Sequence, residues 1–125
     1  MRIHSDFTFE AAHQLRHLPA GHKCRRMHGH HYRVRLVVAG AVDPKMGWVC
    51  DFATLGHAFK PLWKRLDHHC LNDLPGLAKP TAENLAMWLW RRLVKPLPGL
   101  VEIHVWETEK AGCVYAGEHE AGRRP

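Results

Sequence analysis

Two segments of the chain alternate between apolar and polar residues, and this period of two constrains the fold more than any other feature. In residues 2–13, one side carries Ile3, Phe7, Phe9, Ala11 and His13. Residues 28–38 repeat the pattern, and one side carries His28, His30, Tyr32, Val34, Leu36 and Val38. Such alternation is typical of a strand with one buried face. We therefore predict two strands whose inward faces include three histidines.

Two helices are predicted in the middle of the chain. After Asp51, a suitable N-cap, apolar residues recur at steps of three and four at Phe52, Leu55, Phe59, Leu62, Trp63 and Leu66. Pro61 is expected to bend this helix or restart it. The second helix opens at PTAENLA, with Thr81 as its N-cap and Glu83 in its first turn.

Alternation returns near the C-terminus. One face of residues 101–107 carries Val101, Ile103, Val105 and Glu107. The segment CVYAG follows a turn at Gly112 and indicates a fourth strand. The order ββααββ is typical of an α+β protein, here an antiparallel sheet with two helices packed on one face. We expect one domain over residues 1–125, with a mobile polar tail at 118–125.

Composition limits the class of protein. A chain of 125 residues that is 46% hydrophobic is long enough to bury a core as one domain. Its four cysteines form no CxxC pair and its first residues lack a signal-peptide core, so we expect reduced thiols and a cytoplasmic protein. No apolar run reaches the roughly 18 residues of a membrane span. The net charge of +6 calls for an anionic partner, either nucleic acid or a phosphorylated small molecule.

Three of the twelve histidines are candidates for a metal site. Residues two apart on a strand project from one face, so His28 and His30 can hold one ion, while His13 ends the other strand with the same inward phase. Three imidazoles leave the fourth position of a zinc ion to water or substrate, as in catalytic sites. The alternative, core histidines with ordinary hydrogen bonds, would suit a lone histidine better. His31 is expected on the opposite face.

Cys24 lies four residues before His28 in the basic segment GHKCRRM. One interpretation is a fourth ligand that closes the site into a structural one. The other is a general base or nucleophile, because basic neighbours favour the thiolate, and this suits the segment better. Cys50 and Cys113 are expected to be small buried thiols without a role, and Cys70 is open between the two interpretations.

Two further groups are polar where the pattern gives them no obvious partner. Asp67 and His68 follow the first helix in LDHHCLND, as either a solvated pair or an acid–base couple. Glu107 lies on the inward face of its strand, where an unpaired charge would be costly. We predict that Glu107 either forms a salt bridge or binds a ligand with two adjacent N–H donors.

The segments FTFEAAH, CRRMHGHHY, GWVCDF, LDHHCLND, PTAENLA and VWETEKAGCVY together resemble the 6-pyruvoyltetrahydropterin synthase superfamily, most closely its 6-carboxy-5,6,7,8-tetrahydropterin synthase branch from the queuosine pathway. The resemblance covers residues 5 to 118. Its most specific element is a cysteine four positions before HGH, because pyruvoyl-forming relatives place that cysteine six before it. The resemblance implies the tunnelling fold, in which rings of sheets stack into hexamers with active sites at subunit boundaries.

The resemblance also implies a reaction. A lyase of this kind converts 7,8-dihydroneopterin triphosphate to 6-carboxytetrahydropterin, releasing triphosphate and acetaldehyde, and it needs no redox cofactor. Carried over by position, the zinc ligands would be His13, His28 and His30. Cys24 would remove a proton as thiolate. His68, oriented by Asp67, would relay protons, and Glu107 would accept two hydrogen bonds from the pterin edge and share in the relay.

Two positions depart from the family's pattern, since His31 replaces a small polar residue and Cys70 replaces an aromatic one, and extra metal affinity or redox sensitivity stays open at these positions. A lyase that forms 6-pyruvoyltetrahydropterin is the alternative enzyme. An RNA-binding module would explain the charge but leaves the inward histidines without purpose. A structural zinc protein would explain the histidines but offers no convincing fourth ligand. A phosphorylated pterin is therefore the expected partner, rather than nucleic acid or a membrane.

Overall fold

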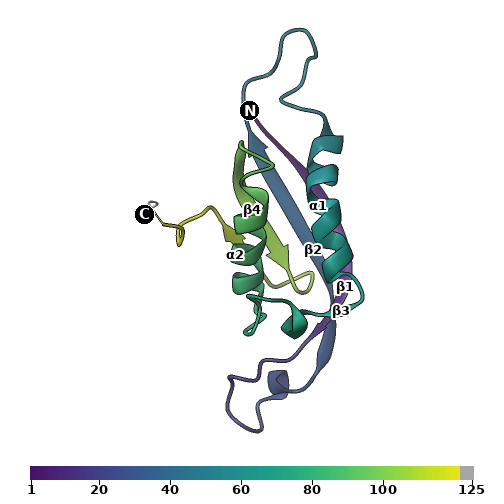
Figure 1. Cartoon of the computed structure of the whole chain (residues 1–125), viewed down its shortest axis with the longest axis vertical. Helices are drawn as coiled ribbons and strands as arrows, with labels where there is room; N and C mark the ends of the chain where they lie inside the picture. Colours follow the sequence, from purple (N-terminus) through teal and green to yellow (C-terminus); the bar gives the residue numbers. More distant parts are fainter. Residues whose placement is uncertain (122–125) are drawn as a thin grey trace.

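The computed structural model describes residues 1–121 and contains a five-stranded sheet with two helices on one face (Figure 1). The strands are β1 (Arg2–His13), β2 (His28–Ala39), β3 (His69–Cys70), β4 (Leu100–Trp106) and β5 (Gly112–Tyr115). The helices are α1 (Phe52–Leu66) and α2 (Ala82–Leu93), with the short 3₁₀ helices η1 (Lys23–Arg25) and η2 (Leu71–Asp73). The predicted α+β class and the placement of both helices are confirmed.

The antiparallel pair of β1 and β2 forms the centre of the fold. The two strands pair along their whole length, from Arg2 opposite Ala39 to His13 opposite His28. Most of their inward side chains are buried under the helices, as the alternation predicts, and the exceptions Ile3, Phe7, His28 and His30 are half-buried. The remaining strands extend this pair, and the sheet order is β3-β1-β2-β4-β5.

The sheet is mixed, which corrects the prediction of a wholly antiparallel one. β3 pairs in parallel with β1, with His69 opposite Ala11 and Cys70 opposite Ala12. A strand of two residues is too short to have a detectable period, so the sequence pattern carried no signal for it. Its consequence is that the segment after α1 lies beside the end of β1.

Both helices begin at the predicted caps. The side chains of Asp51 and Thr81 each accept a hydrogen bond from a backbone N–H in the first turn of α1 and α2. Pro61 lies inside α1 and does not restart it, contrary to one form of the prediction. Proline removes the hydrogen bond to the carbonyl four residues earlier, and that residue, His57, is exposed and can bond to water.

The predicted inward face of β4 is correct at Ile103 and Val105 but wrong at Val101. The register between β4 and β2 shifts beside Val101, and Leu100 is buried in its place. A bulge of this kind interrupts the alternation of side chains, so a period of two read through it gives the wrong face.

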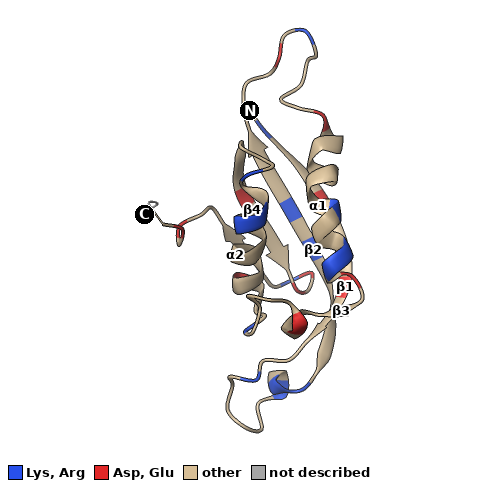
Figure 2. Cartoon of the chain, viewed as in Figure 1, with Lys and Arg blue, Asp and Glu red and all other residues tan. Residues whose placement is uncertain are grey.

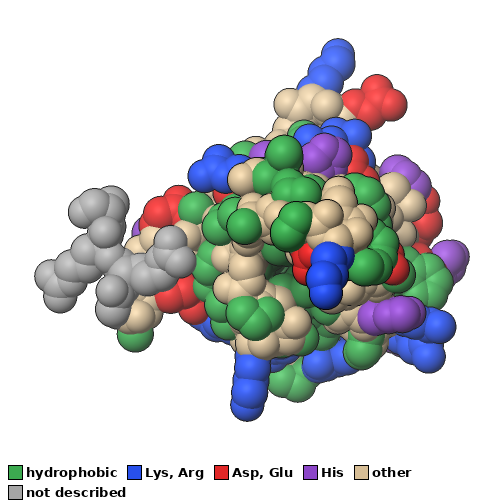
Figure 3. Space-filling model, turned by 90° about the horizontal axis from the view of Figure 1, so that it is seen from above, with side chains coloured by type: hydrophobic (Ala, Val, Ile, Leu, Met, Phe, Trp, Pro, Cys, Tyr) green, Lys and Arg blue, Asp and Glu red, His purple; other side chains and the backbone are tan. Residues whose placement is uncertain are grey.

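The two ends of the molecule differ in chemical character. The loop of residues 40–51, between β2 and α1, projects at one end (Figure 1). Apolar side chains are exposed there among charged ones (Figure 3), at Val42, Met46, Trp48 and Phe52. The loop of residues 14–27 extends from the opposite end and carries basic residues (Figure 2). Within residues 1–121, no helix combines the length and apolar character needed to cross a membrane.

The C-terminal segment packs partly against α2. The predicted mobile tail begins at residue 118, and residues 118–121 form a turn beside the helix. Glu120 pairs with Arg91 at 3.1 Å and accepts a hydrogen bond of 2.5 Å from the hydroxyl of Tyr115. Residues 122–125 of the predicted tail lie outside the described residues.

Replacing Leu89 by alanine should test how much the core between α2 and the sheet stabilises the fold. Leu89 is fully buried, so Leu89→Ala should lower the free energy of unfolding by about 2–5 kcal/mol through lost burial and a residual cavity. Val114→Ala on the exposed side of β5 is the control and should cost less than about 1 kcal/mol. Urea denaturation measures both, and equal costs would contradict the assignment of Leu89 to the core.

Candidate metal centre and active site

The three predicted histidines meet at the end of the β1–β2 pair. His13 is the last residue of β1 and lies opposite His28, the first residue of β2, while His30 follows two residues later on the same face. One ring nitrogen from each of the three lies within 4.8 Å of the other two, so all three can reach one ion. The predicted ligand set is therefore brought together in the structure.

Backbone carbonyls fix how two of these rings present their nitrogens. The Nδ1 atom of His13 donates to the carbonyl of Pro80 at 2.7 Å, and Nδ1 of His28 donates to the carbonyl of Arg26 at 2.7 Å. A carbonyl accepts only, so each ring carries its proton on Nδ1 and leaves Nε2 with a lone pair. Metal-bound histidines are held in this way, by a hydrogen bond from the other ring nitrogen.

The two Nε2 atoms of His13 and His28 lie 3.0 Å apart. Because both protons lie on Nδ1, the lone pairs of the two Nε2 atoms face each other and repel. A cation bound by these two rings and His30 would remove this repulsion. The three residues thus fit a metal ion. Burial lowers the pKa of His13, which keeps its imidazole neutral and able to act as a ligand.

Cys24 and Glu107 line the same cavity as the three histidines. The cavity has a volume of about 380 Å³, and its lining is His13, Leu15, Lys23, Cys24, His28, His30 and Glu107. Glu107 directly follows β4, and one of its carboxylate oxygens lies 3.9 Å from Nε2 of His30. The side chain of Glu107 is 27% exposed, so it keeps room for a ligand as well.

The backbone around Cys24 is held at the mouth of this cavity. Cys24 lies in η1, where its N–H donates to Nδ1 of His22 and its carbonyl accepts from the N–H of Leu15 at 2.9 Å. All four cysteines are free, as expected. A free thiol, three imidazoles and a carboxylate in one cavity are suited to moving protons on a metal-bound ligand.

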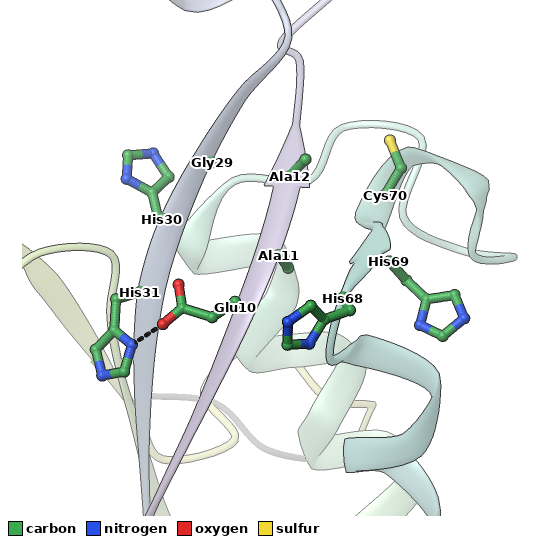
Figure 4. A pocket seen from close by; sticks show the side chains of 9 residues that line it. All are labelled: Glu10, Ala11, Ala12, Gly29, His30, His31, His68, His69 and Cys70. Atoms are coloured by element: carbon green, nitrogen blue, oxygen red, sulfur yellow. Dashed lines mark hydrogen bonds and ion pairs between the residues drawn. The ribbon is translucent and has the colours of Figure 1, made fainter.

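Asp67 and His68 lie apart from the cavity of the three histidines. His68 lies in a cavity of about 490 Å³ beside β1, β2 and β3 (Figure 4). The cavity lined by the three histidines, Cys24 and Glu107 is called the metal cavity below, and His30 is the one residue that lines both. Within one chain, the predicted acid–base couple and the predicted thiol base are therefore not brought into one cavity.

The Asp67–His68 couple is nevertheless tightly positioned. Asp67 caps the end of α1, accepts a hydrogen bond from the N–H of Glu10 at 3.0 Å and contacts Nδ1 of His68 at 2.8 Å. The Glu10 N–H and then the His68 ring lower the pKa of Asp67. His68 has a φ of +57°, which is rare outside glycine, and its N–H donates to the carbonyl of Glu10 at 2.6 Å.

Two residues of this second cavity had no predicted role. Glu10 and His31 lie opposite each other on β1 and β2 and form an ion pair, and the Glu10 carboxylate projects between His31 and His68 (Figure 4). The alternation places both on the polar face, where His31 was expected. Their contact depends on the strand register, which the local pattern does not specify.

A third cavity, of about 230 Å³, adjoins Glu107. It is lined by Ala82, Glu83, Glu107, Ala111, Gly112 and Cys113. From the sequence, Glu83 was assigned only to the first turn of a helix. The fold brings this second carboxylate to the same cavity as Glu107, because the start of α2 lies against β5 and the turn before it.

Comparison with known proteins gives a consistent result. The model of the family described as "6-pyruvoyl tetrahydropterin synthase" matches residues 2–118. A Synechocystis sp. protein named 6-carboxy-5,6,7,8-tetrahydropterin synthase is 44% identical over 119 residues, which are 90% of this chain and 91% of that protein. A Pyrococcus furiosus protein named dihydroneopterin monophosphate aldolase is 34% identical over 84% of this chain and 88% of its own.

The fold comparison agrees with the sequence comparison. The structure of Caenorhabditis elegans 6-pyruvoyl tetrahydropterin synthase superimposes with a TM-score of 0.86 at 27% identity, covering 94% of this chain and 95% of that one.

The reactivity of Cys113 provides a test of its surroundings. Burial raises the pKa of the Cys113 thiol to about 11, so at pH 8 only about one molecule in a thousand carries the thiolate. Iodoacetamide at pH 8 should therefore label Cys113 far more slowly than a cysteine in an unstructured peptide of the same sequence, as followed by peptide mass spectrometry. Equal rates would show that the half-buried thiol of Cys113 in β5 is not shielded from solvent.

Proposed function

Because the chain belongs to the 6-pyruvoyl tetrahydropterin synthase family, we propose that it is a lyase that converts 7,8-dihydroneopterin triphosphate to 6-carboxy-5,6,7,8-tetrahydropterin. One water molecule is consumed, and triphosphate and acetaldehyde are the other products. The observation that carries this proposal is the shared cavity of the three histidines, Cys24 and Glu107, in a chain 44% identical to a relative of that name. The proposed setting is queuosine biosynthesis in the cytoplasm.

Zinc is the proposed metal, held by His13, His28 and His30. Neutral imidazoles suit zinc, and three of them leave a position for the substrate. When bound, zinc would polarise the side-chain oxygens of the substrate and acidify the adjacent C–H and O–H bonds. The carbonyls of Pro80 and Arg26 keep two of the rings in the tautomer that this requires.

Cys24 and Glu107 are proposed to act on the two ends of the reacting substrate. Cys24 would remove a proton from the side chain as thiolate, since it lines the cavity without being needed as a ligand. Glu107 would accept two hydrogen bonds from the 2-amino and N3–H edge of the pterin, because a carboxylate matches two adjacent donors. Its distance of 3.9 Å from the ring of His30 keeps it beside the metal ligands.

The Asp67–His68 couple is proposed to complete the site from another subunit. It relays protons during elimination and carbon–carbon cleavage, with Asp67 orienting the ring of His68. The separation of the two cavities within one chain supports an assembly in which the couple of one subunit faces the metal cavity of the next. A hexamer is the proposed state.

A second candidate product is 6-pyruvoyltetrahydropterin. The likeness to the Caenorhabditis elegans structure favours it, since the fold is shared along nearly the whole chain. The four-residue spacing from Cys24 to His28 and the higher identity to the Synechocystis protein favour the 6-carboxy product.

Product analysis decides between the two. The zinc-loaded protein is incubated with 7,8-dihydroneopterin triphosphate, and the pterin product is identified by mass while acetaldehyde is measured separately. The 6-carboxy product with acetaldehyde is expected, whereas a 6-pyruvoyl product without acetaldehyde would replace the proposal.

Cys24→Ala should keep zinc and lose about 100-fold to 10,000-fold in turnover, as expected for loss of a general base.

Metal content should depend on the inward histidines alone. The protein should contain about one zinc per chain, and His28→Ala should lose both zinc and turnover while keeping most of its fold. His31→Ala, on the opposite face of the same strand, should keep the zinc. Elemental analysis and circular dichroism measure these outcomes. Unfolding of the zinc-free protein would instead indicate a structural site.

Pterin binding should depend on the charge of Glu107. Glu107→Gln replaces a double acceptor with a group that presents a donor to a donor, so affinity for dihydroneopterin triphosphate should fall by about tenfold or more while zinc is retained. Glu109→Gln, an exposed neighbour outside the metal cavity, is the matched control and should bind normally. Calorimetric titration at fixed salt gives the affinities, and an unchanged value for Glu107→Gln would remove it from pterin recognition.

A further inference from the structure

The metal cavity is lined by one cationic side chain among the described residues, Lys23 of η1. Lys23 immediately precedes Cys24, and the backbone of both is fixed by η1 and by the hydrogen bond between Leu15 and Cys24. The side chain of Lys23 is exposed. An ammonium group is thus held at the rim of a cavity whose opposite charge is Glu107.

Two other cations of the same loop, Arg16 and Arg25, already have partners. The guanidinium of Arg25 donates to the carbonyls of Arg16 and Leu18, both at 2.9 Å, and so holds the loop in its shape. The guanidinium of Arg16 reaches the side-chain oxygen of Gln14 once that amide is turned to accept. Lys23, in contrast, forms no hydrogen bond or ion pair through its ammonium group with any residue in 1–121. The guanidinium of Arg26 is also unpaired within these residues, but Arg26 does not line the metal cavity. The charge of Lys23 remains available to a ligand.

The cavity has a defined polarity. Glu107 directly follows β4 and also lines the third cavity beside α2 and β5, whereas Lys23 belongs to η1 in the loop between β1 and β2, so the anion and the cation reach the metal cavity from different segments. The three histidines belong to the same lining. A complementary ligand has N–H donors at one end, oxygens for a metal in its middle and a strong anion at the other end.

We propose that Lys23 binds the phosphate chain of the substrate and makes the metal cavity selective for phosphorylated dihydropterins. This rests on the proposed function, and it adds the residue that recognises the anionic end. A lysine binds phosphate as a point charge and tolerates small changes in its position, which suits a leaving group that departs during the reaction. A relative at 34% identity is named dihydroneopterin monophosphate aldolase. Dihydropterins that differ in their number of phosphates are therefore suitable ligands with which to test this contact.

A competing explanation is that Lys23 acts only on its neighbour Cys24, by favouring the thiolate. The two explanations differ in which measurement responds. A phosphate contact changes binding in proportion to the charge of the ligand, whereas an effect on Cys24 changes turnover equally for every ligand.

The test is a set of calorimetric titrations on zinc-loaded Cys24→Ala protein, with and without Lys23→Ala. The probes are dihydroneopterin triphosphate, dihydroneopterin monophosphate and unphosphorylated dihydroneopterin. Lys23→Ala should weaken binding of the triphosphate by about tenfold or more, weaken the monophosphate less, and change dihydroneopterin by less than about twofold. Lys23→Arg should restore most of the loss, and the difference between ligands should shrink at high salt.

Lys45→Ala is the matched control, because it removes the same charge from the loop at the opposite end of the molecule (Figure 1). It should leave all three affinities unchanged. An equal loss for all three ligands in Lys23→Ala, or no loss at all, would overturn the proposal. These titrations require no turnover, so they remain decisive for Lys23 even if product analysis fails to find 6-carboxytetrahydropterin and the proposed function is abandoned.

Discussion

The antiparallel register between β1 and β2 is the constraint on which the site depends. It sets His13 opposite His28 and so brings three imidazoles from two segments to one point. Slipping either strand by one residue would turn its buried side chains to solvent, including Phe9 and Tyr32, which stack at 5.0 Å between ring centroids. The geometry of the metal ligands is therefore set by the burial of their apolar neighbours on the same strands.

Loop carbonyls convert this placement into a site suited to a metal. The carbonyls of Pro80 and Arg26 fix the protons of two rings on Nδ1, and the two Nε2 atoms are then forced to face each other at 3.0 Å. Pro80 immediately precedes Thr81, the N-cap of α2, so the start of that helix and the metal site are positioned by the same short segment. Stability of the α2 cap and geometry of the ligands are linked through this contact.

The predicted site residues lie in two separate parts of the chain. Cys24, Lys23 and Glu107 surround the histidines, whereas Asp67 and His68 are positioned beside β3 by the backbone of Glu10. The couple is rigid in its own setting, since Asp67 caps α1 and His68 holds a left-handed backbone conformation. The proposed meeting of these groups across a subunit boundary is compatible with this separation within one chain.

The amino-acid sequence by itself determined the four longer strands, the two helices and the choice of three histidines as candidate metal ligands. Alternation, the caps at Asp51 and Thr81 and the phase of the histidines are local properties, and each is readable within a window of a dozen residues. Cys24 and Glu107 followed from spacing and polarity in the same way, and the resemblance of their segments to a known family supplied their roles.

Only the tertiary structure decided the features that join distant segments. The parallel strand β3, the bulge that buries Leu100 instead of Val101 and the Glu10–His31 pair all depend on which residues face each other across strands. The separation of Asp67 and His68 from the metal cavity is of the same kind. Register and packing are set by the whole core at once, and no local period encodes them.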